Sequence, residues 1–306
     1  MGICICCTKK QTIYNVPATK QPDQAENETV IYRNPLSINK PDLNKLDLEQ
    51  DNVYNMQDLI IRNFKEIPKC NFLGERRLNP QGIRQKSFTF YKWSDMETIT
   101  KDLGSGINHL NLAPTLEEYK DFKMRFIGIY AGNIQEWVFT DITAALYGFT
   151  TIPMFDELTP EQSHYIFEKT NVQTLFISCE HIADVIKMTE SKNPAYACIK
   201  NIVVINDHKF NDDSDCQLAD GEHQRFSNDY NDGYQKLRAC GLNCYKWTNV
   251  IDAGRQYPLE YPKIDQNQIH TLYYTSGTTG TPKAAMLSHS NFLTVLSNES
   301  LSNDSK

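Results

Sequence analysis

The sequence comprises 306 residues, of which 40% are hydrophobic and 23% are charged, and its formal net charge is −7. This composition is that of an ordinary globular chain that is long enough for one large α/β domain or two smaller ones. The acidic balance, without a Lys/Arg cluster able to displace counterions from phosphates, argues against nucleic acid as a partner.

The first residues, MGICICC, form a candidate lipidation site. Gly2 is the acceptor for N-myristoylation once the initiator methionine is removed, and Cys4, Cys6 and Cys7 lie where palmitate can be added. The motif prefers Ser or Thr at position 6, so a disordered tail with a chance cluster of cysteines stays open as the alternative. In either case residues 1–50, rich in Asn, Gln, Lys and Pro, are predicted to form a flexible leader.

The nine cysteines predict reduced thiols rather than disulfides, because no export signal precedes them. Cys240 and Cys244 are separated by three residues, and no second Cys/His pair follows at the spacing of a zinc finger, so we expect no metal site. The longest apolar stretch, residues 137–155, is interrupted by Asp141 and several threonines and is too polar to span a bilayer.

Strands and helices are predicted to alternate from about residue 51. Residues 86–93 alternate apolar and polar side chains as a half-buried strand does, and an amphipathic helix follows. Ser94 and Glu97 are predicted to form a capping box at the start of this helix. Its apolar face is expected to consist of Met96, Ile99, Leu103, Ile107 and Leu110.

The same alternation continues to residue 206. Thr159, Pro160 and Gln162 predict a capped helix start with proline in the first turn. Short apolar runs separated by helical patterns are typical of βαβ units, so the sequence predicts an α/β fold with mostly parallel sheets and flanking helices. The expected strands are residues 125–131, 150–155, 172–178 and 199–206, and the expected helices are residues 134–147, 159–168 and 180–189.

Residues 208–245 are polar, acidic and rich in turn residues, and they predict a solvated surface insertion. The Asp spacing of a calcium loop is absent from them. The sheet is expected to resume with the strand at residues 268–274.

This last strand runs into a loop that is suited to hold phosphates. Backbone N–H groups and hydroxyls lie at close range there, the glycines let a ligand approach the main chain, and a lysine follows. The loop is no Walker A motif, because Pro282 stands where that motif has glycine and Ala284 follows the lysine. A plain Ser/Thr/Gly linker is the structural alternative. The candidate phosphate-binding residues are Thr275, Ser276, Gly277, Thr278, Thr279, Gly280 and Lys283.

Ten consecutive residues, YTSGTTGTPK at 274–283, resemble the phosphate-binding signature of the adenylate-forming, or AMP-binding, enzymes. This superfamily includes acyl-CoA synthetases, luciferases and peptide-synthetase adenylation domains. Residues 72–77, 126–161 and 286–292 look like the corresponding stretches of long-chain fatty acyl-CoA synthetases. The resemblance covers roughly residues 50 to 300.

The resemblance implies an ATP-dependent long-chain fatty acid–CoA ligase. Such enzymes form an acyl-adenylate and pyrophosphate from ATP, with Mg²⁺, and then transfer the acyl group to coenzyme A. The loop from Thr275 to Lys283 would hold the β- and γ-phosphates, and His289 occupies the place of the family's histidine at the start of the next helix. Where the family has glycine after the lysine, this chain has Ala284.

The family places its adenine, ribose and magnesium contacts and its catalytic lysine downstream of this loop. We therefore expect residues 51–306 to be a partial AMP-binding domain from a truncated or incomplete chain, with catalytic residues beyond residue 306. A non-catalytic, lipid-anchored nucleotide-binding or regulatory module is the alternative. The family and the lipidation motif together predict the cytoplasmic side of the endoplasmic reticulum or another endomembrane, and otherwise the cytoplasm.

Overall fold

The computed structural model describes residues 19–20, 32–33, 52–76, 85–116, 124–155, 158–206, 231–275 and 283–303, with the backbone alone in the first two ranges and from residue 297. The predicted lipidation residues Gly2, Cys4, Cys6 and Cys7 lie outside the described residues. Two short strands are described within the predicted leader, β1 (Thr19–Lys20) and β2 (Tyr32–Arg33), and they pair antiparallel. The boundary at residue 50 stays a prediction.

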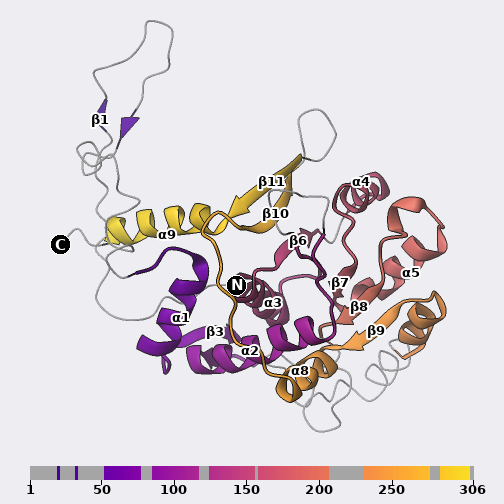
Figure 1. Cartoon of the computed structure of the whole chain (residues 1–306), viewed down its shortest axis with the longest axis horizontal. Coiled ribbons are helices and arrows are strands. Elements are labelled where there is room, and N and C mark those ends of the chain that lie inside the picture. The colour runs from indigo at the N-terminus through magenta and orange to yellow at the C-terminus, as the bar shows by residue number, and fades with distance from the viewer. Residues whose placement is uncertain are drawn as a thin grey trace, which may run out of the picture.

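A seven-stranded sheet forms the centre of the molecule, in the order β11-β10-β6-β5-β7-β8-β9 (Figure 1). All neighbouring strands run parallel except β10 and β11, which are antiparallel. The predicted α/β fold with a mostly parallel sheet is therefore confirmed. The strands are β5 (Phe126–Tyr130), β6 (Thr150–Met154), β7 (Thr174–Ile177), β8 (Asn201–Val204), β9 (Asn243–Lys246), β10 (Ile269–Thr275) and β11 (Lys283–Ser288).

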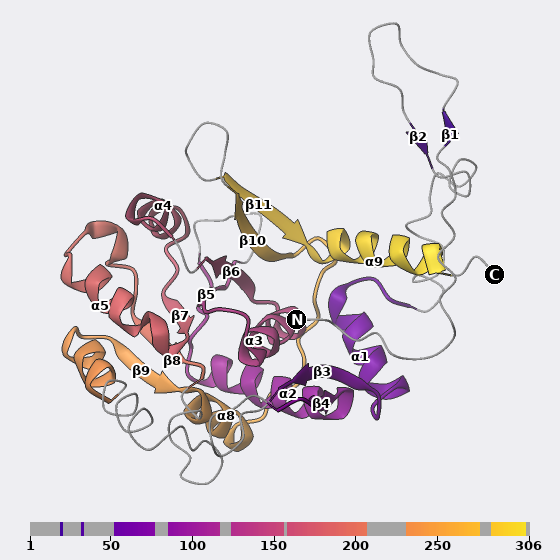
Figure 2. The same ribbon diagram turned by 180° about the vertical axis from the view of Figure 1, so that it is seen from behind.

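Helices cover both faces of this sheet (Figures 1 and 2). One face carries α1 (Met56–Glu66), α2 (Trp93–His109), α3 (Gln135–Tyr147) and α8 (Trp247–Gln256), and the other carries α4 (Pro160–Thr170), α5 (Ile182–Glu190) and the helical residues 231–239. Alternate residues of a strand point to opposite faces, so Ile127 and Ile129 join the first core while Phe126 and Tyr130 join the second. The chain after β11 continues as α9 (His289–Asn303).

A separate hairpin precedes α2. The strand β3 (Asn71–Glu75), which the sequence analysis did not predict, pairs antiparallel with β4 (Thr89–Lys92). The predicted capping box of Ser94 and Glu97 is wrong, because α2 already begins at Trp93. The indole of Trp93 packs on Phe72 with 4.4 Å between ring centroids. The carboxylate of Asp95 accepts a hydrogen bond from the N–H of Lys92 at 2.8 Å. A helix that starts at Trp93 therefore packs this indole and also caps its own first turn.

The other predictions along the chain have mixed outcomes. The capped start of α4 is confirmed, since the Thr159 hydroxyl accepts the N–H of Gln162 while the Gln162 side chain accepts the N–H of Thr159. The predicted surface insertion at 208–245 is wrong for residues 231–245, where a helix buries Leu237 and β9 joins the sheet edge. Leu237 and the few other apolar residues of this stretch stand among polar neighbours, so the polar composition predicted a surface segment. Residues 207–230 lie outside the described residues.

Helices α2 and α8 approach each other so closely that only glycine fits between their backbones. A Cβ on Gly254 would lie 1.7 Å from the carbonyl oxygen of Asp102, and one on Gly106 would lie 1.9 Å from that of Val250. Both obstacles are main-chain atoms, which cannot move without shifting a helix. The contact therefore fixes α8, and with it the chain that leaves α8 toward β10.

This contact yields a stability prediction. Gly254→Ala is expected to lower the free energy of unfolding by about 3 kcal/mol or more, because overpacking here displaces backbone rather than a flexible side chain. Gly241→Ala is the matched control, since nothing lies within 4 Å of its added Cβ and only its φ of +83° opposes the change, which costs about 1 kcal/mol. Urea denaturation measures both variants. Equal losses would contradict the packing argument.

Candidate functional site

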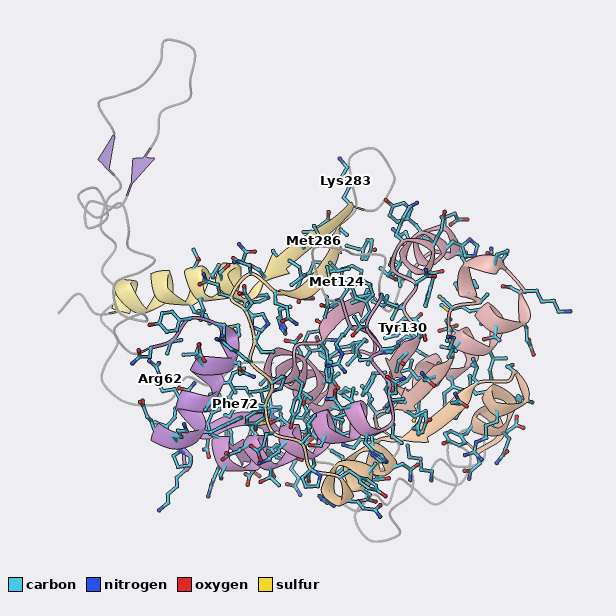
Figure 3. The ribbon with its side chains drawn as sticks, viewed as in Figure 1. Arg62, Phe72, Met124, Tyr130, Lys283 and Met286 are labelled. Carbon is cyan, nitrogen blue, oxygen red and sulfur yellow. The ribbon has the colours of Figure 1, made fainter. Side chains whose placement is uncertain are left out.

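The predicted phosphate loop is the tip of the β10–β11 hairpin, which projects from one edge of the central sheet (Figure 3). The register pairs Thr275 with Lys283, so the two ends of the loop lie on adjacent strands at the end of the ladder. The hydroxyl of Thr275 donates to the carbonyl oxygen of Lys283 at 3.4 Å. Ser276, Gly277, Thr278, Thr279 and Gly280 lie outside the described residues, and their phosphate contacts stay a prediction.

Lys283 marks the start of β11 and its side chain is exposed. Within the described residues it forms no ion pair, so its ammonium group is available to an anion at the mouth of the loop. In Figure 3 it stands at the outer end of the hairpin, while Met286 lies farther along β11 toward the helix. The arrangement suits a cation that meets the outer phosphates of a nucleotide.

The root of the hairpin contains a buried polar cluster from three elements, which sequence reasoning missed apart from His289. The Nε2 atom of His270 on β10 lies 3.3 Å from Oδ1 of Asp141 on α3, and the His270 ring lies 5.5 Å from the ring of His289, the first residue of α9. The rings of His270 and Phe292 pack edge to face at 5.2 Å. A charged or polar residue inside an otherwise apolar strand or helix pattern was the signal that could have revealed this cluster.

His289 is fully buried and is held as a neutral imidazole. Within the part of the chain that the structure describes, neither of its ring nitrogens has a hydrogen-bond partner. Burial, and then repulsion from His270, lowers the pKa of His289 from 6.5 to about 3, against the opposing attraction of Asp141 and Asp265. The side chain does not face solvent, so the structure assigns it a place in the core rather than in contact with substrate.

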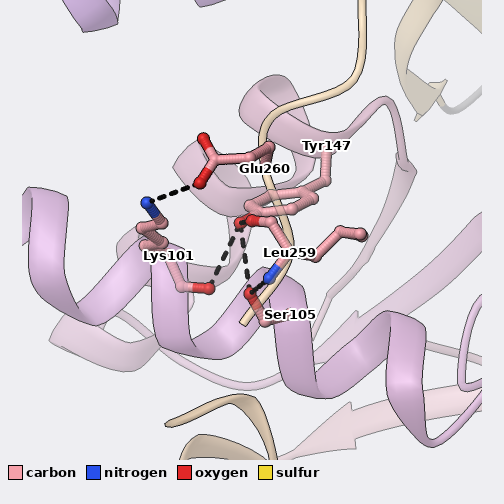
Figure 4. A network of polar contacts seen from close by, with 5 residues as sticks. All are labelled: Lys101, Ser105, Tyr147, Leu259 and Glu260. Atoms are coloured by element: carbon pink, nitrogen blue, oxygen red, sulfur yellow. Dashed lines mark hydrogen bonds and ion pairs between the residues drawn. The ribbon is translucent and has the colours of Figure 1, made fainter. Parts of the chain in front are cut away.

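The segment that carries the chain into β10, residues 257–268, is fastened by side chains of the helices beneath it (Figure 4). The hydroxyl of Ser105 on α2 accepts the N–H of Leu259 at 2.9 Å, and the hydroxyl of Tyr147 on α3 lies 3.0 Å from the Leu259 carbonyl oxygen, to which it donates. Side chains at the start of α1 hold the rest: Gln57 donates to the carbonyl of Pro262 at 2.8 Å and Asn55 donates to that of Ile264 at 3.0 Å. Three helices thus set where β10 begins.

A second feature of the central sheet is a cleft of about 490 Å³ between α4 and α5. Tyr130, at the carboxyl end of β5, lines it together with Ser163, His164, Lys187 and Tyr196. The chain leaves β5 toward one face of the sheet and leaves the adjacent β7 toward the other, which is the arrangement at which open α/β sheets bind ligands. Lys187 lies 3.5 Å from the carboxylate of Asp184, so the cleft does not carry a strong positive charge.

The described residues provide no group of three or more His, Cys, Asp or Glu side chains that could hold a metal ion. Burial raises the pKa of Cys244 to about 11, so this thiol is protonated at neutral pH and is a poor metal ligand. Among the described helices, none is long and apolar enough to cross a membrane.

The matches to known proteins agree with this fold. A family model described as "AMP-binding enzyme" matches residues 110–305, so the chain belongs to the AMP-binding enzyme family. The family predicted from the loop signature is thereby confirmed. Among solved structures, the adenylation domain of the carboxylate reductase from Mycobacterium chelonae matches 77% of this chain and 34% of its own, with a TM-score of 0.55 at 17% identity. At that identity the likeness concerns the fold.

Curated relatives include acyl-CoA ligases. The peroxisomal acyl-CoA ligase 891 of Penicillium roqueforti is 27% identical over 289 residues, which are 92% of this chain and 36% of the relative. Long chain acyl-CoA synthetase 1 of Arabidopsis thaliana is 23% identical over 76% of this chain and 30% of its own length. The chain therefore spans about a third of the length of these relatives.

The buried histidine yields a pH prediction. Because the pKa of His289 is lower in the folded state than in the unfolded one, the unfolded chain binds the proton first as the pH falls below 6.5. The free energy of unfolding should therefore decline toward pH 3, by up to about 1.4 kcal/mol per pH unit from this group. His289→Gln should flatten that slope, and His109→Gln, at an exposed position on α2, should leave it unchanged. Identical slopes for all three proteins would contradict the assignment.

Proposed function

We propose that this chain is the phosphate-binding part of an ATP-dependent acyl-CoA ligase that acts on long-chain fatty acids. The observation that carries the proposal is the β10–β11 hairpin, which brings Thr275 and Lys283 to the two ends of a Ser/Thr/Gly loop. Family membership supports adenylate chemistry, and the curated relatives named as acyl-CoA ligases and long chain acyl-CoA synthetases support a fatty acid as the acid substrate.

The proposed reaction has two balanced steps. A carboxylate oxygen attacks the α-phosphorus of ATP, the bond from that phosphorus to the bridging oxygen breaks, and pyrophosphate leaves with the electron pair. The thiol of coenzyme A then loses its proton and attacks the acyl carbon, and AMP leaves with the bonding electrons. Mg²⁺ accompanying ATP would offset the charge of the phosphates.

The contribution of this chain lies in the first step. Negative charge accumulates on the departing pyrophosphate, so donors that are already oriented toward it lower the barrier. Lys283 supplies a positive charge at the start of β11, and the N–H groups of loop residues 276–281 would supply the remaining donors. The paired strands on either side would hold the two ends of the loop in place before ATP arrives, which would limit the entropy lost on binding.

We also propose that a lipid anchor holds the protein on the cytoplasmic side of an endomembrane. Gly2 would carry a myristoyl group, and Cys4, Cys6 and Cys7 would carry palmitate. A fatty acid substrate partitions into the bilayer, so an anchored enzyme would meet it at the surface. One acyl chain binds a membrane only marginally, and a stable anchor needs the second signal.

Binding of tripolyphosphate tests the phosphate loop without requiring turnover. The 306-residue chain is expected to bind it with a Kd on the order of 1 mM in calorimetry, because phosphate must compete with water and salt for the exposed Lys283. Lys283→Ala should weaken this binding about tenfold, as expected for loss of a charge-assisted contact. Lys187→Ala, which removes a lysine already paired with Asp184, should not change it. Equal affinities for Lys283→Ala and the unaltered chain would contradict the loop assignment.

Ligase activity is tested on the full translation product of the messenger RNA. Exchange of pyrophosphate into ATP should depend on a long-chain fatty acid such as oleate, and Lys283→Ala should reduce the exchange rate about 100-fold by removing charge stabilisation from the departing pyrophosphate. Exchange that is independent of the carboxylic acid, or absent from a protein that binds tripolyphosphate, would instead favour a non-catalytic nucleotide-binding module.

The lipid anchor is tested by membrane flotation after expression in a eukaryotic cell. Gly2→Ala should move the protein to the soluble fraction, whereas joint replacement of Cys4, Cys6 and Cys7 by serine should leave the weak, reversible attachment of one chain. Cys70→Ser, within the described domain, is the control and should not alter flotation. If Gly2→Ala floats like the unaltered protein, myristoylation does not occur.

A further inference from the structure

The β10–β11 hairpin is joined to the parallel sheet by a short junction. The ladder between β5 and β6 extends from Phe126 and Thr150 to Tyr130 and Met154, whereas β6 and β10 share the single register pair Thr151 and Thr271. Beyond that pair β10 continues to Thr275 paired with β11 alone. The outer half of the hairpin is therefore an arm that leaves the sheet at Thr271.

Side-chain hydrogen bonds reinforce the junction where the backbone ladder is short. The hydroxyl of Thr150 donates to the carbonyl of Ile269 at 2.7 Å, and that of Thr271 donates to the carbonyl of Thr151 at 3.2 Å. Both bonds join adjacent positions along β6 and β10. By themselves they therefore resist separation of the two strands better than they resist rotation of β10 relative to β6.

Asp141 provides a contact outside the plane of the sheet. Its Oδ1 atom accepts the hydroxyl of Thr151 on β6 at 3.1 Å and lies 3.3 Å from Nε2 of His270 on β10. One carboxylate oxygen on α3 thereby holds both strands of the junction. His270 in turn packs on His289 and Phe292, so the contact extends to α9, the helix that follows the other strand of the hairpin.

The carboxylate also acts electrostatically on the outer arm. Burial, and then the negative charge of Asp141, raises the pKa of Tyr273, which lies two residues before the end of β10. Leu272 and Tyr274 pack the opposite face of the arm into the core, where the rings of Tyr274 and Tyr165 on α4 meet edge to face. Tyr273 is 36% exposed and Met286 on β11 is 54% exposed, so the face that carries Tyr273 has little packing of its own. On that face the arm is held mainly at its root.

We propose that Asp141 is a positioning residue that fixes, through Thr151 and His270, the direction in which the β10–β11 arm leaves the sheet, and hence where the phosphate loop stands. The proposal rests on the proposed function insofar as the loop binds phosphates. Removal of the carboxylate would leave the arm held by the core packing of Leu272 and Tyr274 on one face alone, and would loosen it about the Thr151–Thr271 pair without unfolding the sheet, because β5, β7 and β8 do not contact this junction through their ladders.

Hydrogen exchange of the purified 306-residue chain tests the proposal at residue resolution. In Asp141→Ala, backbone amides of residues 272–275 and 284–287 should exchange about tenfold faster, while those of β7 and β8 keep their rates. Asp141→Asn retains an acceptor for Thr151 and for the His270 ring, so it should restore most of the protection. Faster exchange throughout the sheet, or unchanged exchange in the arm, would overturn the proposal.

A matched variant separates this role from the loss of any carboxylate. Asp102 on α2 is also largely buried, with a side-chain exposure of 17% against 28% for Asp141, and it lies 2.8 Å from Nε of Arg255. Asp102→Ala should leave exchange in the arm unchanged. The double variant Thr151→Val/Asp141→Ala should increase the exchange rate by less than the product of the fold-increases in the two single variants, because both substitutions remove the same contact. A fold-increase equal to that product would contradict a joint action of Thr151 and Asp141.

Tripolyphosphate binding connects the arm to the loop. Asp141→Ala should weaken binding about threefold to tenfold, and Asp141→Asn should restore it. Lys283→Ala should weaken binding while exchange in the arm stays slow, so a failure of the phosphate-loop proposal and a failure of the positioning proposal give different results. If the arm is mobile in Asp141→Ala and the affinity is unchanged, the loop is not positioned by Asp141.

Discussion

The constraint on which the site depends is the return of the chain across the sheet. Strand β9 lies at one edge, and β10 begins beyond β6, on the far side of β8, β7 and β5. Helix α8 and the segment 257–268 make this crossing. The glycine contact between α2 and α8 fixes the start of the crossing, and hydrogen bonds from Ser105, Tyr147 and the residues of α1 fix its course. These contacts therefore fix where β10, the first strand of the hairpin, begins.

The parts of the fold that were predictable are those in which local pattern and burial agree. The strands β5 to β8 are fully buried short apolar runs, and α4 carries its capping residues in sequence, so periodicity and side-chain chemistry were sufficient. The start of α2 was misplaced because packing of Trp93 outweighs the local signal of Ser94. The helix at 231–239 was missed because a few buried residues such as Leu237 stand among polar neighbours, and only the sheet edge beside them explains their burial.

The two ends of the hairpin also differed in how far the sequence could predict them. The loop residues were recognisable from their types alone, since hydroxyls, glycines and a lysine in that order have a direct chemical use. The root was not recognisable, because Asp141 and His270 are separated by more than a hundred residues and each resembles an interruption in an apolar pattern. Their relation exists only once β10 lies beside β6, and β10 lies there because of a crossing segment that has no motif.

The root and the tip of the hairpin also have opposite electrostatic requirements. At the tip, the ammonium group of Lys283 is exposed to solvent, where an arriving phosphate can reach it. At the root, His289 is held neutral by burial, so the first turn of α9 adds no charge beneath the arm. A protonated His289 there would attract Asp141 away from Thr151 and His270, the two groups that the carboxylate holds together. The neutral His289 thus leaves the Asp141 carboxylate in contact with Thr151 and His270. In our proposal this carboxylate serves the site by its position and not by attracting a ligand.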